Sequence, residues 1–165
     1  MKPEVTDVQI RTIEPRDNAP LARVIRATLM EFGAAKPGTV YYDETTDRLS
    51  DVFAVPGSVY YVAEYQGVIV GGGGIYPTAG LPEGTCELVK MYLLPQVRGI
   101  GQGSALIQKS LDFAKDYGYR QVYLETMPEL QQALNTYAKF GFEYLNAPMG
   151  ESGHFGCDLW MLKSF

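Results

Sequence analysis

The sequence predicts an α/β domain of the mixed α+β type, with a central, mostly antiparallel sheet of six to seven strands and about four helices on its faces. Three observations support this fold class. The chain has 165 residues, of which 46% are hydrophobic, so it is large enough for one domain with a substantial core. The spacing of apolar residues changes repeatedly between strand-like alternation and helical recurrence. Residues 85–126 read as strand, helix and strand, a unit that joins two parallel strands.

The first predicted elements are a strand and two helices. Residues 8–13 alternate apolar and polar side chains, as a half-buried strand does. Pro20 suits the first turn of a helix, apolar residues then recur at helical spacing as far as Phe32, and Gly33 ends the pattern. Residues 43–53 predict a second, shorter helix that stops before a Pro-Gly pair.

Three consecutive strands are predicted next. Residues 58–65 and 68–76, separated by Gln66-Gly67, indicate a hairpin, and residues 85–94 add a third strand. The middle strand contains four glycines in a row, at 71–74. Glycine weakens a strand unless a ligand or another backbone comes close, so a bulge or a close-packed sheet position is at least as well supported as a binding role.

The second half of the chain alternates helices with strands. We predict a helix at 103–117 ended by Gly118, a strand at 121–126, a helix at 128–140 ended by Gly141, and strands at 142–145 and 157–162. The full order is β-α-α-β-β-β-α-β-α-β-β. No linker, repeat or low-complexity segment divides it, so residues 1–165 are expected to form a single domain.

Composition narrows the function classes. A net charge of −5 without a basic stripe argues against a nucleic-acid partner, and it is mildly compatible with a cationic substrate, although many proteins are acidic for solubility alone. No apolar run is long enough to span a membrane, and residues 1–4 do not resemble a signal peptide. We therefore expect a cytoplasmic protein with free thiols at Cys86 and Cys157. With His154 as the one histidine, no metal site is expected.

A glycine-rich turn carries the main functional signal. The strand at 85–94 leads into Arg-Gly-Ile-Gly-Gln-Gly-Ser at residues 98–104, and the helix follows at once. Glycines let the backbone turn tightly and expose its N–H groups, and a helix N-terminus adds the positive end of its dipole. Arg98 adds a full positive charge. This combination predicts a site for a phosphorylated ligand.

Two other glycine motifs compete for this turn. A Walker loop needs a lysine before its Ser or Thr, and Gly103-Ser104 lacks it. A dinucleotide fingerprint needs the spacing GxGxxG, and here Ser104 falls where the pattern fails. Glu125 does lie about 20 residues on, where a ribose-binding acid would stand. Too little chain follows the turn, however, for a doubly wound sheet.

The third candidate pattern fits the turn. Arg98-x-x-Gly101-x-Gly103 resembles the (Arg/Gln)-x-x-Gly-x-(Gly/Ala) pattern of the Gcn5-related N-acetyltransferase (GNAT) superfamily. Residues 137–142, Tyr-Ala-Lys-Phe-Gly-Phe, resemble the Tyr-x-x-x-Gly-Phe signature of the same superfamily. The resemblance covers most of the chain and is strongest over residues 85–145.

The resemblance implies acetyl-CoA as co-substrate, bound as in the family. The pantetheine arm would use the main chain of Met91, Tyr92 and Leu93, where the third strand splays from the strand at 121–126. Buried main-chain groups in that gap would find partners in the pantetheine amides. The diphosphate would lie against the backbone of Arg98, Gly99, Ile100, Gly101, Gln102, Gly103 and Ser104.

Two side chains are the candidate catalytic residues. Glu87 would take the proton from the acceptor amine, because some family members carry a catalytic glutamate on this strand and burial would raise its pKa. The alternatives are that Glu87 binds the amine as a cation, or pairs with Lys90 or Arg120. Tyr137 would protonate the leaving thiolate, against the alternative of a core aromatic residue. A backbone N–H, at Met91 or Leu93, would polarise the carbonyl.

Other candidates are weaker. Leu130 stands where many relatives have an asparagine. His154 could bind the acceptor or move a proton, but an exposed loop position is the stronger expectation. Four tyrosines could cage a cation, although simple packing is the commoner role: Tyr41, Tyr42, Tyr60 and Tyr61.

The sequence thus predicts an N-acetyltransferase that acts on a small-molecule or peptide amine in a ternary complex. The alternatives are a non-catalytic acyl-CoA-binding module of the same fold and, less favoured, a dinucleotide-binding oxidoreductase. A homodimer through an edge strand is compatible with the sequence. No nucleic-acid or membrane partner is expected.

Overall fold

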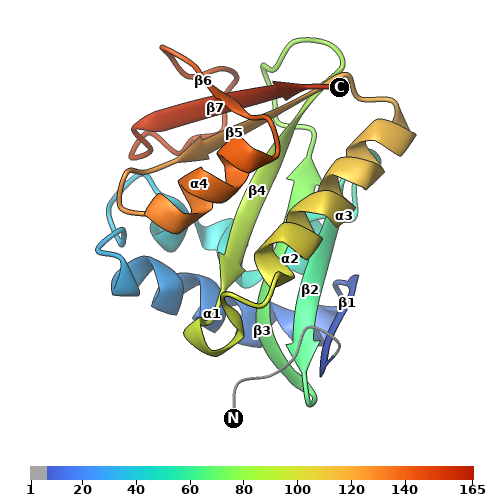
Figure 1. The fold of residues 1–165 in the computed structure, drawn as a ribbon, viewed down its shortest axis with the longest axis vertical. Coiled ribbons are helices and arrows are strands. Elements are labelled where there is room, and N and C mark those ends of the chain that lie inside the picture. The colour runs from blue at the N-terminus through green and yellow to red at the C-terminus, as the bar shows by residue number, and fades with distance from the viewer. Residues whose placement is uncertain (1–6) are drawn as a thin grey trace.

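A seven-stranded mixed sheet forms the centre of the computed structural model, which describes residues 7–165 (Figure 1). The segment 1–4, which we expect not to be a signal peptide, lies outside the described residues. The strand order is β1-β2-β3-β4-β5-β7-β6, and among the described strands β4 and β5 form the parallel pair. The strands are β1 (Val8–Thr12), β2 (Val59–Tyr65), β3 (Val68–Tyr76), β4 (Thr85–Leu93), β5 (Gln121–Thr126), β6 (Glu143–Tyr144) and β7 (Leu159–Ser164).

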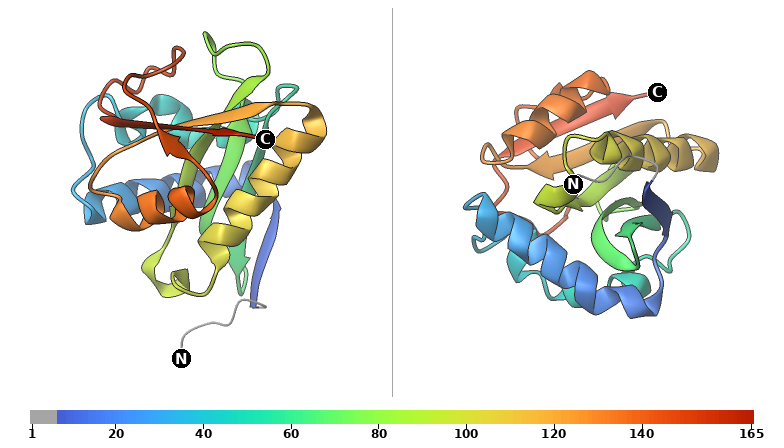
Figure 2. Two further views of the ribbon diagram at one scale, coloured as in Figure 1. Left: turned by 45° about the horizontal axis from the view of Figure 1, so that its top comes forward. Right: turned by 60° about the horizontal axis from the view of Figure 1, so that its bottom comes forward.

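Helices cover both faces of this sheet, which confirms the predicted fold class. Helix α1 lies on one side, and α3 and α4 lie on the other (Figure 2). The α-helices are α1 (Asn18–Glu31), α2 (Leu49–Val52), α3 (Gln102–Tyr117) and α4 (Gln131–Lys139). Short 3₁₀ turns are η2 (Pro15–Asp17), η3 (Val40–Tyr42), η4 (Glu44–Asp47) and η5 (Pro95–Val97).

The predicted second helix at 43–53 is largely wrong. This segment holds the turn η4 and the single-turn helix α2 instead. The Asp43 carboxylate accepts hydrogen bonds from the backbone and hydroxyl of Thr45, and the Thr46 hydroxyl donates to the Val40 carbonyl at 3.0 Å. These local hydrogen bonds compete with the backbone hydrogen bonds of a continuous helix. The segment therefore forms separate turns.

The four glycines of β3 serve close packing. A Cβ at Gly72 would come within 2.6 Å of the Tyr60 ring, and one at Gly73 would collide with the Met91 side chain. The register between β3 and β4 also shifts between Gly72 and Gly74. The expected close-packed, irregular sheet position is therefore confirmed, and it leaves room for a buried tyrosine on one face and a methionine on the other.

Strands β4 and β5 separate after a short parallel ladder. Their register pairs join residues 85–87 to residues 121–123, after which β4 continues to Leu93 and β5 to Thr126 without further pairing between them. Lys90 adopts a left-handed conformation with φ +52° at this point, and the Tyr60 hydroxyl donates to its carbonyl at 2.6 Å. The splay that the family resemblance implies is thus present, and a bulge in β4 accompanies it.

Candidate active site

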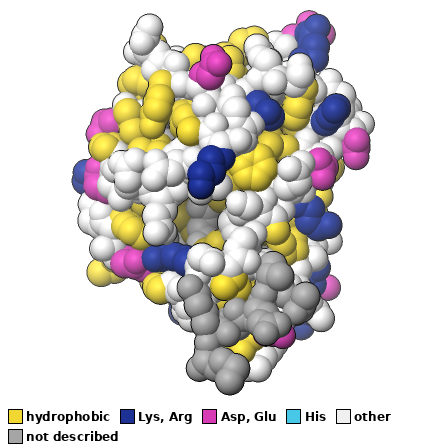
Figure 3. All heavy atoms as spheres, viewed as in Figure 1, with side chains coloured by type: hydrophobic (Ala, Val, Ile, Leu, Met, Phe, Trp, Pro, Cys, Tyr) yellow, Lys and Arg dark blue, Asp and Glu magenta, His cyan; other side chains and the backbone are white. Residues whose placement is uncertain are grey.

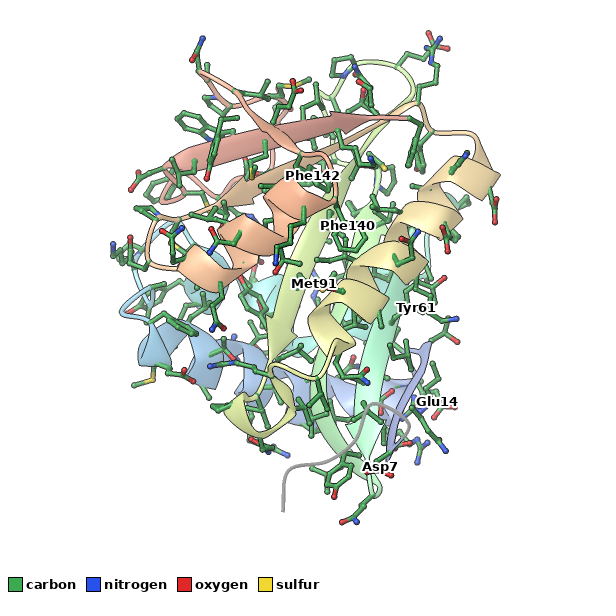
Figure 4. The ribbon with its side chains drawn as sticks, viewed as in Figure 1. Asp7, Glu14, Tyr61, Met91, Phe140 and Phe142 are labelled. Carbon is green, nitrogen blue, oxygen red and sulfur yellow. The ribbon has the colours of Figure 1, made fainter. Side chains whose placement is uncertain are left out.

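A groove of about 400 Å³ lies beside the start of α3. Figure 3 shows the molecular surface hollowed where α4, the first turn of α3 and α1 approach one another. Met91 lies on β4 at this place (Figure 4). The lining includes eight of the ten residues predicted to contact the cofactor: Met91, Tyr92, Leu93, Arg98, Gly99, Gly101, Gly103 and Ser104.

A second, enclosed cavity of about 40 Å³ lies in the splay between β4 and β5. It is lined by polar and charged side chains that include Glu87, Lys90, Glu125 and His154. Four residues line both cavities, so the two spaces adjoin across the sheet: Met91, Tyr92, Leu130 and Tyr137. A reaction between a ligand in the groove and one in the cavity would take place at this boundary.

Two glycines shape the cradle at the start of α3. Gly99 and Gly101 have φ values of +75° and +89°, a region that favours glycine. A Cβ on Gly101 would meet nothing within 4 Å, so its backbone conformation rather than packing requires glycine there. Because α3 begins at Gln102, its first N–H groups have no partner within the helix and are available to an anion.

Two predicted cradle residues contribute less than expected. Ile100 and Gln102 lie outside the groove lining, and Gln102 is only 2% exposed. The Gln102 side chain points into the protein, so its contribution is limited to the main chain. Both remain predictions as backbone contacts.

Arg98 is tied to α1. Its Nε donates to the Leu93 carbonyl at 2.9 Å, and its two Nη atoms donate to the Glu31 carboxylate at 2.6 and 3.1 Å. The guanidinium also lies 5.0 Å from the centre of the Phe32 ring. Arg98 therefore connects the cradle to the end of α1, and a diphosphate would compete with Glu31 for its charge.

Glu87 is buried at the inner end of the cavity. It is 3% exposed, and Thr78 Oγ1 donates to its Oε1 at 2.5 Å. The pKa of Glu87 is raised to about 7. Burial is the main cause and the nearby Glu125 carboxylate adds to it, while Thr78, His154 and Lys90 act in the opposite direction. Within residues 7–165 no ion pair joins Glu87 to Lys90 or Arg120, and its side-chain hydrogen bond comes from Thr78.

Tyr137 lies between the two cavities. Helix α4 positions it, and its ring packs edge-on against Phe142 with centroids 5.8 Å apart. The side chain is 6% exposed, and burial raises the pKa of its phenol. The hydroxyl therefore stays protonated at neutral pH and is able to donate a hydrogen bond or a proton. Tyr137 is a core residue that also lines both cavities. Its position is therefore compatible with either interpretation of the sequence, a proton donor or a core aromatic residue.

Several functional candidates escaped the sequence analysis. His154 was expected on an exposed loop, but its side chain is 11% exposed and its Nε2 lies 2.8 Å from Asp43 Oδ2. Glu125, weighed only as a ribose-binding acid, accepts a hydrogen bond from the Tyr123 hydroxyl at 2.8 Å and another from Ser152. The signal available was period-two spacing, because Tyr123 and Glu125 share one face of β5.

The four tyrosines do not form a cage: Tyr60, Tyr41 and Tyr61 pack in or against hydrophobic clusters, and Tyr42 is 62% exposed. Tyr60 is fully buried and Tyr41 packs against the same cluster on the α1 side of the sheet. Tyr61 packs against the clusters on the α3 side, with Lys109 Nζ 5.3 Å from its ring centre.

The described residues also bear on metal binding, membrane insertion and the state of the thiols. Within residues 7–165, no three His, Cys, Asp or Glu side chains gather as metal ligands. None of the helices described there has the length and apolarity that a membrane crossing requires. Cys86 and Cys157 are both buried and free, as expected.

Comparison with known proteins agrees with this geometry. The model of the acetyltransferase (GNAT) family matches residues 24–142, which is more than half of the chain. The chain belongs to the GNAT family. YjgM of Escherichia coli K12, named an uncharacterized N-acetyltransferase, is 39% identical over 155 residues, 93% of each chain. Human N-acetyltransferase 8 is 34% identical over 119 residues, 68% of this chain and 52% of that protein.

Solved GNAT structures show the same fold. An acetyltransferase of the family from Staphylococcus aureus Mu50 has a TM-score of 0.84 at 17% identity, over 95% of this chain and 98% of that one. The PaiA N-acetyltransferase of Thermoplasma acidophilum, solved in complex with coenzyme A, has a TM-score of 0.74 at 17% identity, over 96% and 99%. Family and relatives together confirm the predicted enzyme class, N-acetyltransferase.

Proposed function

We propose that this GNAT enzyme transfers the acetyl group of acetyl-CoA to a primary amine by direct attack in a ternary complex. One observation carries the proposal: a glycine-lined groove and a carboxylate-lined cavity adjoin at Tyr137. The structural relative PaiA, which shares the fold, was solved with coenzyme A. Acetyl-CoA supplies an activated thioester, and the residues of this chain bind, orient and move protons.

The residues present fit a coenzyme A ligand. The cradle at Gly99 to Ser104 offers main-chain donors at a helix N-terminus to the diphosphate. Beyond Glu87, β4 has no ladder partner on its β5 side, so this edge can bind the pantetheine amides along Met91, Tyr92 and Leu93, although the Leu93 carbonyl already accepts from Arg98. We propose Ile100 and Gln102 as backbone contacts only.

Glu87 would receive the proton of the acceptor amine. An alkylamine is mostly protonated at neutral pH, so the nucleophile must first lose a proton. A carboxylate with a pKa of about 7 is well matched to this task, because half of it is ionised at neutral pH while it holds a transferred proton well. Glu125 beside it adds negative charge, which attracts the acceptor as a cation before deprotonation.

Tyr137 would donate a proton to the departing sulfur. Its position in the lining of both cavities supports this role, because the leaving group separates from the acceptor where the two spaces adjoin. The backbone N–H of Met91 or Leu93, beside the bulge of β4, would stabilise the negative charge on the carbonyl oxygen.

The acceptor is a small molecule or a peptide with an unhindered amine. A cavity of about 40 Å³ holds little more than one water-sized group, so it suits the end of a chain such as a –CH₂–NH₃⁺ group. Cytoplasmic location and a homodimer through an edge strand stay proposals.

A thiol-release assay with acetyl-CoA and a panel of primary amines tests the function. We expect turnover with at least one amine, and tight binding of acetyl-CoA but not of NAD in isothermal titration. Binding without turnover for every amine would favour the non-catalytic module. Binding of NAD in preference to coenzyme A would favour the oxidoreductase, although β4–β5 is the one parallel strand pair within residues 7–165.

A further inference from the structure

A buried base needs a route for its proton. If the proposed function holds, each turnover leaves one proton on Glu87, whose side chain is 3% exposed. That proton must reach solvent before the next amine is deprotonated. The groups that could carry it are those that share the small cavity with Glu87, namely Lys90, Glu125 and His154.

The contact with Asp43 fixes the tautomer of His154. His154 Nε2 lies 2.8 Å from Asp43 Oδ2, and this bond, together with Thr45 and Lys90, holds the pKa of Asp43 far below its usual range. Asp43 is therefore ionised and only accepts hydrogen bonds, so Nε2 of the neutral ring carries the hydrogen. The nitrogen with the free lone pair is Nδ1.

His154 lines the cavity, and Nδ1 is the ring nitrogen that does not contact Asp43. It is 4.0 Å from Glu125 Oε1, whose nearer hydrogen bonds come from the hydroxyls of Tyr123 and Ser152. The cavity volume of about 40 Å³ is enough for one water molecule, which occupies about 30 Å³ in the liquid. A single water there would connect the Glu87 carboxyl group to Nδ1.

The loop that carries His154 is held in place. The His154 backbone N–H donates to Ser152 Oγ at 3.1 Å, and the Gly156 N–H donates to the Gly38 carbonyl at 2.8 Å. The loop therefore holds His154 beside Asp43, whose side chain is 21% exposed and forms the solvent end of the proton route.

We propose that His154 relays the proton of Glu87 to solvent, through one water in the cavity, with Asp43 setting the tautomer of the ring. Nδ1 accepts the proton that Glu87 gives up, and the Nε2 proton then leaves past Asp43 to solvent. A rotation of the imidazole ring between turnovers returns its hydrogen to the Asp43 side, so that the nitrogen facing Glu87 can accept a proton again. His154 acts through Glu87 and does not touch the reacting atoms.

The other charged groups around the ring are compatible with this role. Protonated His154 lies between the carboxylates of Asp43 and Glu125, which stabilise the added charge. Lys90, 7% exposed, has its Nζ 3.8 Å from Asp43, and burial lowers its pKa. The Cys157 thiol keeps its proton because burial raises its pKa to about 12.

Nuclear magnetic resonance tests the geometry without any substrate. His154 is the one histidine of the chain, so its imidazole signals need no assignment. At pH values where the ring is neutral, we expect the ¹⁵N chemical shifts of the Nε2–H tautomer. In Glu87→Gln, we expect the titration midpoint of His154 to move to lower pH, because an anionic neighbour is removed. Glu83→Gln, an exposed carboxylate, is the control and should leave the midpoint unchanged. The other tautomer, or an unmoved midpoint in Glu87→Gln, would overturn the relay.

Kinetics provide the second test. His154→Gln keeps an amide donor for Asp43 but cannot carry a proton, so kcat should fall about 10- to 100-fold while the Kd for acetyl-CoA stays unchanged. In His154→Ala, added imidazole should restore turnover in proportion to its concentration. Wild-type kcat in His154→Gln, or no imidazole effect in a folded His154→Ala, would refute the proposal. If the wild type acetylates no amine, the proposed function fails, and the resonance experiment still decides whether His154 and Glu87 are coupled.

Discussion

Glu87 and Tyr137 belong to different secondary-structure elements but line the same small cavity. Both side chains are almost completely buried. Burial raises the pKa of both groups, because it disfavours the charged form of each. For Glu87 this raises the pKa into the neutral range, where a base is useful. For Tyr137 it keeps the phenol protonated, where a donor is useful.

Replacing Tyr137 with phenylalanine removes the proposed proton donor and keeps the ring that packs against Phe142. We expect kcat to fall about 100-fold, at the lower end of the range for a lost proton-transfer group, with little change in the Kd for acetyl-CoA. Steady-state kinetics and isothermal titration measure the two quantities. A wild-type kcat in Tyr137→Phe would remove the hydroxyl from the mechanism.

Glu87 should also make stability depend on pH. Its pKa in the folded protein, about 7, is above the ordinary value of 4.5, so the folded state holds the proton more tightly than the unfolded state. The contribution of Glu87 to the free energy of unfolding therefore falls as the pH rises from about 4.5 to about 7. Glu87→Gln has no carboxyl group to titrate at this position. The free energy of unfolding of the variant minus that of the wild type should therefore increase by up to about 3 kcal/mol between pH 4.5 and 8.

Urea unfolding at several pH values measures this difference. The exposed Glu83→Gln variant is the control and should track the wild type at every pH. A difference between Glu87→Gln and wild type that stays constant with pH would show that Glu87 titrates normally.

At this scale, sequence reasoning found the residues that local motifs carry. Glu87 and Tyr137 lie within or beside recognisable segments, so their neighbourhoods could be predicted. Asp43 and His154 are 111 positions apart and come together only through two loops, which no local pattern links. Their contact could not have been read from spacing.

At the level of elements, the start of α3 concentrates the structural requirements of the cradle. Gly101 is in a left-handed conformation with open space around its α-carbon, and Gly118 at the other end of α3 is in a similar one, with φ +111°. The two glycines thus share the same backbone requirement and differ in whether a ligand site is near.

This pair gives a controlled test of the cradle. Gly101→Ala and Gly118→Ala should each lower the free energy of unfolding by about 1–2 kcal/mol, because alanine is strained in this conformation. Only Gly101→Ala should also weaken acetyl-CoA binding, since only it alters the donors at the helix N-terminus. Thermal unfolding and isothermal titration separate the effects, and equal affinity in both variants would place the diphosphate elsewhere.

Element prediction succeeded where one interaction dominates and failed where several compete. The helices α1 and α3 show clear helical spacing and end at glycines, and both were predicted to within a few residues. The segment at 43–53 has helical spacing too, but Asp43, Thr45 and Thr46 bond to nearby groups and break it into turns. The bulge at Lys90 depends on the Tyr60 hydroxyl, which comes from a strand 30 residues away.

For the whole molecule, the central fact is that the sheet is joined weakly at its middle. Strands β1 to β4 form one part and β5, β7 and β6 form the other, and only residues 85–87 and 121–123 pair between them. The groove is lined by β4 on one part and by α4, which follows β5, on the other. A ligand in the groove therefore contacts both parts.

Coenzyme A should accordingly stabilise the whole fold. At a free concentration 100 times its Kd, a ligand that binds only the folded state adds about 2.7 kcal/mol to the free energy of unfolding. We expect coenzyme A and acetyl-CoA to raise the Tm in a concentration-dependent way, and NAD to leave it unchanged. A Tm insensitive to coenzyme A species would contradict the assignment of the groove.

The four residues common to both cavities have a practical consequence for inhibitor design. Since Met91, Tyr92, Leu130 and Tyr137 line both spaces, a molecule that mimics both reactants at once must pass beside these four side chains. Its linker should be slim and unbranched, with bulk confined to either end. Enlarging the opening, for example by shortening Leu130, is the natural route to a variant that accepts branched acyl donors or hindered amines.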